Sequence, residues 1–566
     1  MANLKNNRTL FATTSPRTPS LMIPDLKLLS DSFTGQVWNR QTQTSFMHLL
    51  TQVDDKKGEN LNKANIDLAA RDRINRSPKS FGFVRLKPTI ELTPAGSALL
   101  QTRRTDEIFL RQFLKYQLPS PFHKQTAQNG RFRIKPYLEL FRMIRELGSM
   151  TFDEIRLYGL QLTDYRDFDR IVNEVKVFRR EKANHAGRYK AFLQKTIEEI
   201  IRELYSEEIL SGHTRTRESS DASVQTFIAK KARNMRDYAD AIFRHLRATE
   251  LVEISQSGRS ISIAVGREAE VDFILNTIDR EPADFATEAD YIEYLGDISQ
   301  PILLLDDHNL LTQMLHDEFG IAVPEAMETW QIKDVLAEAR ENRKEGLLKQ
   351  YITRLKQHQE YDDVVTTFQG IKNKTYYDCA LMLEWNTWRA MTMLNSGNIR
   401  ANLKFDDTGL PVSTALGNAP DIECDYGSFG LTVEVTLTSG QRQFFTECEP
   451  VPRHLGRFKD GMKGKQVYSL FIAPKINDAT VAHFFSLRRL KMDYYGGDTI
   501  IIPMQLDTFE HMVENSHNAE EIPAPFQVEA FFKKAISIAD EQEGGDAHVK
   551  WYNKVMELAN NWPSYA

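Results

Sequence analysis

Residues 418–454 have the sequence NAPDIECDYGSFGLTVEVTLTSGQRQFFTECEPVPRH, and this stretch decides the fold expected for the C-terminal part of the chain. Alternating side chains over 431–438 indicate a strand, and Asp421 opens a preceding strand across a short turn. The apolar residues of the second strand share one face, and Glu434 lies on the other face. Asp421 and Glu434 then share a sheet face if the register aligns them.

Two carboxylates at that separation suit Mg2+, which prefers a few carboxylates together with water and substrate phosphate. Such an ion could polarise a phosphodiester and lower the pKa of an attacking water. A PD-(D/E)xK nuclease motif places lysine two residues after the glutamate, where this chain has Thr436. The motif is therefore incomplete, and two solvated carboxylates on a hairpin are the alternative interpretation.

Further candidate groups lie close to this pair in the sequence. Glu447 is expected on the next strand, with His454 close behind, and Glu384 lies on an apolar and aromatic helix over 381–394. A carboxylate in such a helix is costly unless it is paired or bound to a metal. For Glu384 the alternatives are an exposed helix position or an ion pair with Arg389. For His454 the alternative to proton transfer is a structural hydrogen bond.

The 566-residue chain is too long for one hydrophobic core, so two to four domains are expected. Its longest apolar runs are strand-sized, and no apolar segment near the N-terminus resembles a signal peptide. Three cysteines without a CxxC indicate free thiols in a reducing cytoplasm and give no zinc-type spacing. We therefore expect a cytoplasmic protein without a membrane span.

The charge is divided unevenly along the chain. Residues 1–280 carry 46 Lys and Arg against 34 Asp and Glu, a balance of +12. The remainder carries 26 against 44, a balance of −18, which gives the overall net charge of −6. A basic part beside an acidic part is typical of a protein that grips phosphates with one region and collects cations with another. Solvated helix faces are the alternative explanation.

Two helix-and-hairpin patterns in the basic part suggest winged-helix-like modules. The first hairpin lies within 80–101, and the second, over 251–265 with a Ser-Gly turn at 257–258, follows a basic helix over 226–249. Many α+β proteins contain such a combination, which is the alternative. Arg and Lys here could contact phosphates or bases, unless they are merely solvated or ion-paired. The DNA-binding candidates are Arg17, Arg71, Arg73, Arg76, Lys79, Lys230, Lys231, Arg233 and Arg236.

The rest of the chain divides into a helical connector and a mixed sheet. Residues 286–370 are acidic and helical, with a solvent-facing helix over 330–359. Strands at 421–426, 431–438, 466–473 and 499–504, with helices between the later ones, predict a mixed α/β sheet. The expected fold is therefore multidomain, α+β and α/β. It has winged-helix-like subdomains over 1–150 and 151–285, a linker over 286–370 and an α/β domain over 371–566.

Sequence blocks along nearly the whole chain resemble the AlwI-like type IIS restriction endonucleases, in the family's order. They are TSPRTP (14–19), ARDRINRSPKSFGFV (70–84), DEIFLRQFLKYQLPSP (106–121), NMRDYADA (234–241), LEWNTWRAM (383–391), GNAPDIE (417–423), LTVEVTLTSGQ (431–441), EPVPRHL (449–455) and LFIAPKIN (470–477). The nearest resemblance is to PleI, MlyI and related strand-nicking enzymes.

The resemblance implies an N-terminal recognition region of two subdomains, a helical linker and a C-terminal PD-(D/E)xK-like domain. Such enzymes recognise a short asymmetric sequence in double-stranded DNA, here GAGTC by the nearest resemblance, and cut a few nucleotides downstream. The family's catalytic carboxylates map onto Glu384, Asp421, Glu434 and Glu447, with Mg2+ expected at Asp421, Glu434 and Glu384. The family also has Val-Thr after the second glutamate, so Thr436 is a family trait.

Three functions stay open at this point. The chain could cut both strands, with a transient second copy or a separate small subunit supplying the second active site. It could nick one strand, because one active site cuts one strand. It could also be an inactive DNA-binding regulator with a nuclease-like dimerisation domain.

Overall fold

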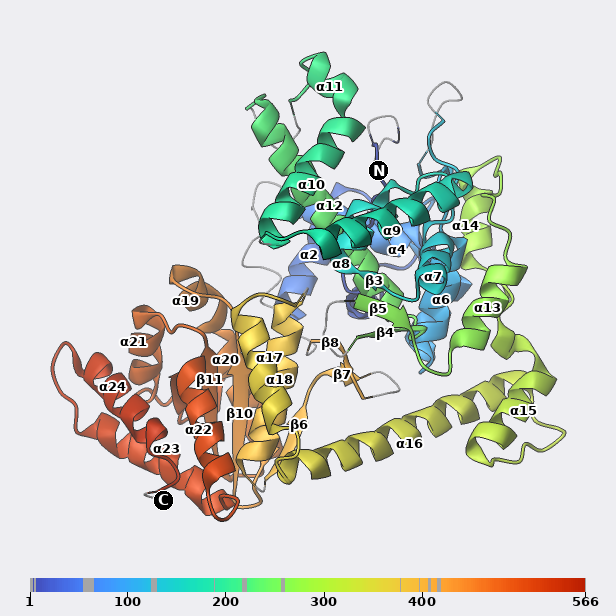
Figure 1. Ribbon diagram of the computed structural model, residues 1–566. Helices are drawn as coiled ribbons and strands as arrows, with labels where there is room; N and C mark the ends of the chain where they lie inside the picture. The colour runs from blue at the N-terminus through green and yellow to red at the C-terminus, as the bar shows by residue number, and fades with distance from the viewer. Residues whose placement is uncertain are drawn as a thin grey trace. The chain divides into compact units, whose positions relative to one another are not determined.

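The computed structural model divides into two compact units, Met1–Arg340 and Glu341–Ala566. It describes residues 4, 7–53, 66–123, 130–187, 189–215, 221–255, 260–376, 378–395, 397–405, 409–414 and 419–564. The predicted Ser-Gly turn at 257–258 lies outside these residues. Among the helices described, none is long and apolar enough to cross a membrane. The protein is a multidomain α+β structure (Figure 1).

The first unit is mainly helical and contains two small antiparallel sheets. Its elements are η2 Pro19–Leu21, α1 Met22–Phe33, α2 Arg40–Val53, α3 Ile66–Asn75, α4 Ser77–Ser80, β1 Val84–Arg85, β2 Glu91–Leu92, α5 Pro94–Gln101, α6 Thr105–Lys115, α7 Pro136–Leu147, β3 Met150–Thr151, α8 Phe152–Leu157, η6 Gly159–Gln161, η7 Tyr165–Asp167, α9 Phe168–Asn184, α10 Tyr189–Leu204, α11 Ser206–Leu210, α12 Val224–Arg247, β4 Val252–Ile254, β5 Ser260–Ile263, α13 Glu268–Thr277, α14 Glu288–Gly296, η8 Leu304–Asp306 and α15 His308–Phe319. Helix α16, Thr329–Lys356, begins in this unit and continues into the second.

Both predicted hairpins are present. The first consists of β1 and β2, two residues each, and leads into α5, where the Thr93 hydroxyl accepts a hydrogen bond from Gly96 N at 3.1 Å. The second consists of β4 and β5 and follows the 24-residue helix α12, as predicted. Strand β3 joins this hairpin, which gives a three-stranded sheet in the order β3-β5-β4.

The expectation of a solvent-facing connector helix is wrong for the N-terminal half of α16. Ile332, Leu336 and Ala339 are buried there and pack with Leu311 and Leu315 of α15. Their spacing of four and three residues places them on one helix face. The many charged residues of this helix conceal that apolar stripe in the sequence.

The second unit contains the predicted mixed sheet, in the order β12-β11-β10-β9-β6. Strands β9 and β10 are antiparallel, as are β6 and β9, whereas β10, β11 and β12 run parallel. The elements after α16 are α17 Tyr361–Lys372, α18 Cys379–Leu394, β6 Asn398–Ala401, β7 Lys404–Phe405, β8 Pro411–Ser413, β9 Ile422–Asp425, β10 Phe429–Val435, α19 Gln441–Glu447, α20 Pro450–Gly461, β11 Gln466–Ala473, α21 Asp478–Leu487, η9 Asp493–Tyr495, β12 Ile501–Gln505, α22 Leu506–Asn518, α23 Pro525–Asp540 and α24 Ala547–Asn560.

Helices cover both faces of this sheet (Figure 1). On one face, Val467 and Phe471 of β11 join a core cluster with Val451 and Leu455 of α20. Tyr468 of β11 points to the opposite face, where it stacks on Phe532 of α23 with ring centroids 4.8 Å apart. Strand β10 is consequently buried on both faces, which excludes the alternative of two solvated carboxylates on a hairpin for Glu434. The amphipathic helix α20 covers the face that carries the polar residues.

Helix α20 packs closely against η9, and a glycine permits the contact. A Cβ at Gly456 would lie 2.8 Å from the backbone carbonyl carbon and oxygen of Tyr495. Backbone atoms cannot move aside as a flexible side chain can, so the two segments would have to separate. At Gly461, the last residue of the same helix, a Cβ would meet nothing within 4 Å.

We expect Gly456→Ala to lower the free energy of unfolding by about 1–3 kcal/mol through overpacking. Gly461→Ala, the matched control, is expected to change it little or to raise it by up to about 1 kcal/mol through helix propensity. Thermal unfolding of both variants measures the difference. Equal stabilities would show that α20 and η9 are not held as closely as described.

Candidate active site

Asp421 and Glu434 lie side by side at the end of two neighbouring strands. The last paired residues of β9 and β10 are Ile422 and Val433, so the next pair in register is Asp421 and Glu434. The Val435 amide donates a hydrogen bond to Asp421 Oδ2 at 2.8 Å. This bond fixes one carboxylate against the backbone that carries the other. The predicted juxtaposition of the two acids is therefore present, at the C-terminal end of β10.

Glu434 is nearly buried, with 7% of its surface exposed, and contacts His454 of α20. Its Oε1 lies 2.7 Å from His454 Nδ1. His454 is only 2% exposed, because the apolar face of α20 packs on the sheet around it. A buried carboxylate requires hydrogen-bond partners, and the imidazole is one of them. The structural hydrogen bond considered for His454 is thus observed.

The prediction that Glu447 lies on a strand is wrong, because Glu447 is the last residue of helix α19. Strand β10 ends at Val435, and Gly440, with a φ of 64°, turns the chain into the helix. The helix nevertheless brings Glu447 back to the site. Its Oε1 accepts hydrogen bonds from the hydroxyls of Thr436 and Thr446, both at 3.1 Å. Thr436, which occupies the motif's lysine position, therefore contacts a candidate catalytic carboxylate.

Gln443 holds together the loops around this edge of the sheet, and no sequence pattern points to it. Its side chain is fully buried. The amide nitrogen donates to the carbonyls of Thr438 at 2.8 Å and Lys475 at 2.9 Å, while the amide oxygen accepts from Asn477 N at 2.8 Å. One side chain thereby joins the segments that follow β10 and β11. Helix α19 contains two glutamines, and its sequence does not indicate that one of them joins two loops.

Glu384 lies on α18 at the level of the Asp421 end of the sheet. The Trp388 indole donates to Ile399 O of β6 at 3.2 Å, and the amide of Asn395 donates to the Tyr426 hydroxyl beyond the far end of β9. Glu384 is one helical turn, about 6 Å, before Trp388 and hence nearer the Asp421 end. The buried Arg389 forms an ion pair with Asp363 of α17, a partner other than Glu384, the one considered from sequence.

The carboxylates suit a divalent cation that retains its own water. Within the residues described, no group of three or more His, Cys, Asp and Glu side chains could hold a metal ion. Mg2+ needs only one or two carboxylates, because water and phosphate oxygens complete its shell. Asp421 and Glu434 provide hard oxygen donors of that kind. The cysteines do not compete, because Cys424 and Cys448 are buried free thiols and burial raises the pKa of Cys448 to about 12.

Several DNA-binding candidates in the first unit form ion pairs within the protein. Arg73 pairs with the fully buried Asp25, and Lys79, itself buried, pairs with Glu288 at 2.6 Å. Arg71 and Arg76 are exposed and pair one turn away, with Asp67 and Asp72. Arg17 contacts Asp237 and Asp240 of α12. These candidates do not form a single cluster of unpaired charge.

The candidates on α12 differ in exposure. Lys231 lies over the rings of Tyr205 and Phe227, at 4.2 and 5.2 Å from their centroids, whereas Arg233 and Arg236 are exposed and Lys230 is half-buried. Arg156 of α8 joins them: it donates to Ala232 O at 2.9 Å. Burial, with a contribution from the nearby Arg236, lowers the pKa of the Arg156 guanidinium. Only the packing of α8 on α12 reveals this neighbour.

We expect Arg73→Met to destabilise the protein by about 3–5 kcal/mol, because it removes one partner of a pair whose other member is buried. The matched change Arg71→Met removes an exposed pair one helical turn apart and should cost less than about 0.5 kcal/mol. Chemical denaturation of both variants tests this. Similar stabilities for the two would mean that the Arg73 pair is not structural.

Comparison with known proteins identifies the family of this chain. Residues 79–512 match the family model described as AlwI restriction endonuclease. Among solved structures, the small subunit of the heterodimeric restriction endonuclease R.BspD6I is 26% identical, over 35% of this chain and 98% of that chain, with a TM-score of 0.30. The BpuJ1 endonuclease binding domain, in complex with pyrene- and phenanthrene-modified DNA, is 12% identical, over 52% of this chain and all of that chain, with a TM-score of 0.34. No curated protein matches significantly. Since the family model spans most of its length, the chain belongs to the AlwI restriction endonuclease family.

Proposed function

We propose that this chain is a type IIS restriction endonuclease that binds GAGTC and hydrolyses phosphodiester bonds a few nucleotides downstream. The observation that carries the proposal is the hydrogen bond from Val435 N to Asp421 Oδ2, which holds Asp421 beside Glu434. Two carboxylates at the carboxyl end of a central strand are what a PD-(D/E)xK-like site requires. Family membership supports phosphodiester cleavage as the chemistry.

Asp421 and Glu434 would hold Mg2+, with Glu384 as a third candidate ligand from α18. When bound, the ion supplies charge for the scissile phosphate and lowers the pKa of a bound water. The protein's own contribution is orientation. His454 fixes one oxygen of Glu434, and the Val435 amide fixes one oxygen of Asp421. Both carboxylates therefore keep their direction before DNA arrives.

Glu447 is the group best placed to orient or deprotonate water, because its carboxylate is held by two hydroxyls. Thr436 cannot carry the positive charge of the usual lysine. In this chain it acts through Glu447, as a positioning residue. The missing lysine therefore does not argue for an inactive protein.

We assign DNA recognition to the first unit, with winged-helix-like subdomains over 1–150 and 151–285. The hairpin β4-β5, with α12 packed on β4 and on α8, supports the second subdomain. Arg156, Arg233 and Arg236 are the basic groups best placed for phosphate or base contacts. Arg73 and Lys79 serve the fold first, because their partners are Asp25 and Glu288.

The linker would span 286–370 and the cleavage domain 371–566. The boundary between the two compact units, at Arg340, falls within that linker. One active site per chain cuts one strand, so cleavage of both strands requires a transient second copy or a separate small subunit. A strand-specific nicking enzyme is the alternative outcome. The proposal includes a prokaryotic cytoplasmic location, where a restriction endonuclease would meet DNA.

The test is incubation of the purified protein with supercoiled plasmid containing GAGTC, with and without Mg2+, followed by run-off sequencing of both strands. We expect Mg2+-dependent cuts at a fixed distance from GAGTC, on one strand or both. Asp421→Asn and Glu434→Gln should abolish cleavage while the affinity for the site is retained. Cleavage by either variant would contradict the metal-site assignment, and specific binding without cleavage by the wild type would indicate a regulator.

We expect Thr436→Val to slow cleavage about 10- to 100-fold, because a hydrogen bond to a charged group contributes about 1.5–3 kcal/mol. Thr436→Ser keeps the hydroxyl and should cleave at close to the wild-type rate. Single-turnover cleavage at saturating protein measures both, and binding to uncleaved DNA in Ca2+ serves as a control. Wild-type cleavage by Thr436→Val would remove Thr436 from the site.

A further inference from the structure

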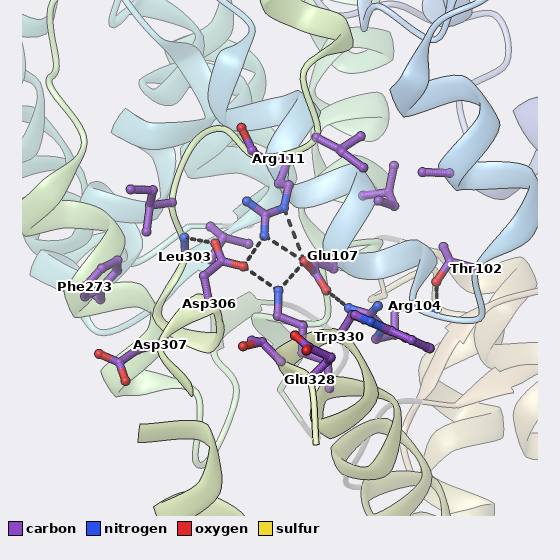
Figure 2. A pocket seen from close by; sticks show the side chains of 17 residues that line it. Thr102, Arg104, Glu107, Arg111, Phe273, Leu303, Asp306, Asp307, Glu328 and Trp330 are labelled. Atoms are coloured by element: carbon purple, nitrogen blue, oxygen red, sulfur yellow. Dashed lines mark hydrogen bonds and ion pairs between the residues drawn. The ribbon is translucent and has the colours of Figure 1, made fainter. Parts of the chain in front are cut away.

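A cluster of buried charges joins three distant segments of the first unit (Figure 2). Glu107 of α6 accepts hydrogen bonds from Arg111 Nη2 and Lys333 Nζ, both at 2.8 Å, and from Arg104. Asp306 of η8 accepts from Arg111 at 2.6 Å and also from Lys333 of α16. We call Glu107, Arg111, Asp306 and Lys333 the anchor.

Three of the four anchor side chains are largely shielded from solvent, so their charges interact strongly. The side chains of Arg111 and Lys333 are 4% and 8% exposed, and that of Glu107 is 14% exposed. Burial by itself would raise the pKa of Glu107, but the charges of Lys333, Arg111 and Arg104 lower it. The anchor lines one wall of a cavity of about 800 Å3 that also contains Ile302 and the half-exposed Trp330. Each anchor charge has an opposite charge within the anchor.

An ion pair of Arg340 and the apolar stripe also hold the N-terminal half of α16. Arg340 donates to Glu270 Oε1 at 3.0 Å, and Glu270 also pairs with Arg267 at 2.8 Å. Lys333 and Arg340 are seven residues apart, so they lie on one face of the helix two turns apart. The apolar stripe that includes Ile332 packs on α15.

Ion pairs fix the rotation and register of a helix, whereas an apolar stripe does not. Apolar contacts are non-directional, so a helix can slide or rotate on them at moderate cost. Lys333 Nζ between two carboxylates is different, since a shift of one residue would rotate it by about 100° and break both bonds. Buried ion pairs contribute little to net stability but can select one arrangement among several. The anchor therefore defines the direction of α16 on the first unit.

The same helix continues beyond the first unit. The boundary between the units lies at Arg340, inside α16, which is one uninterrupted helix to Lys356 and contains no proline. From Lys333 to Lys356 it rises about 35 Å at about 1.5 Å per residue. A tilt of about 6° at the anchor would displace its end by about 3.4 Å, which is one nucleotide step.

We propose that the anchor determines the cleavage offset, with Lys333 as a positioning residue for the choice of phosphodiester bond. The inference rests on the proposed function, because it presumes cleavage at a fixed distance from the site. The anchor acts through the direction of α16 and touches neither the scissile bond nor the recognised bases.

The test compares Lys333→Met with Lys333→Arg and with Lys349→Met. Lys333→Met removes the charge and keeps the length, and Lys333→Arg keeps the charge. Lys349→Met makes the same change on the same helix at an exposed pair whose charged atoms lie 3.9 Å apart. Asp306→Asn is a milder second variant, because the Asp306 side chain is already 26% exposed. The native Asp306 accepts a hydrogen bond from Leu303 N, and an asparagine keeps an oxygen for that bond.

Two measurements are made on each variant. In hydrogen exchange followed by mass spectrometry, we expect amides in 329–340 to exchange at least tenfold faster in Lys333→Met and to be unchanged in Lys349→Met. In run-off sequencing, we expect the share of cuts at the main position to fall at least twofold in Lys333→Met, with new cuts at neighbouring positions. Lys333→Arg and Lys349→Met should keep the wild-type distribution.

Each possible result of these measurements either supports the proposal or overturns it. Faster exchange with an unchanged cut distribution, or no change in either measurement, overturns it, because a purely structural role would lower stability or rate without moving the cut. If Lys333→Met does not fold, Asp306→Asn must show the same redistribution or the proposal fails. If the wild type does not cut DNA, the proposed function fails and the offset inference falls with it, while hydrogen exchange still reports whether Lys333 holds α16.

Discussion

The second unit depends on the pairing of β10 with two neighbours of opposite direction. Antiparallel pairing with β9 brings Asp421 next to Glu434, and parallel pairing with β11 aligns the C-terminal ends of both strands. Polar groups gather at that common edge because the loops that follow the strands leave it together. Beyond the last pair of β9 with β10, the Val435 amide donates to Asp421 instead of to a β9 carbonyl. The end of one hydrogen-bond ladder thus creates the candidate active site.

The polar face of β10 is buried, and this burial determines the polarity of the surroundings of Glu434. Helix α20 covers Glu434 and supplies His454, so the carboxylate is held in an environment of low polarity with a hydrogen-bond partner. A charge in such surroundings interacts more strongly with a cation than it would in water. The same packing makes Gly456 necessary, since α20 must also approach the backbone of η9. Catalytic geometry and close packing are therefore imposed by the same helix.

In the first unit, much of the positive charge is engaged by carboxylates of the protein itself. Arg73 with Asp25, Lys79 with Glu288 and Lys333 with Glu107 tie together segments that are distant in sequence. These pairs orient elements more than they stabilise them, because the cost of desolvation offsets most of the attraction. The excess of +12 over residues 1–280 remains after such pairing. Exposed arginines such as Arg233 and Arg236 carry part of it and are available for phosphate.

The sequence by itself determined the elements whose side-chain periodicity is strong. The strands near 422 and 466, the helix that becomes α12 and the mixed sheet follow from local pattern, whereas the pairing of Asp421 with Glu434 also required the register of β9 with β10. Local pattern could not place Glu447 on a helix, because a glycine reversal at Gly440 redirects the chain and this is not visible as periodicity. Nor could it find Gln443, Arg156 or the anchor, since each depends on which distant segments meet. Tertiary structure decided these features, because hydrogen bonds and ion pairs between remote residues form only after the apolar faces of the helices and strands have packed.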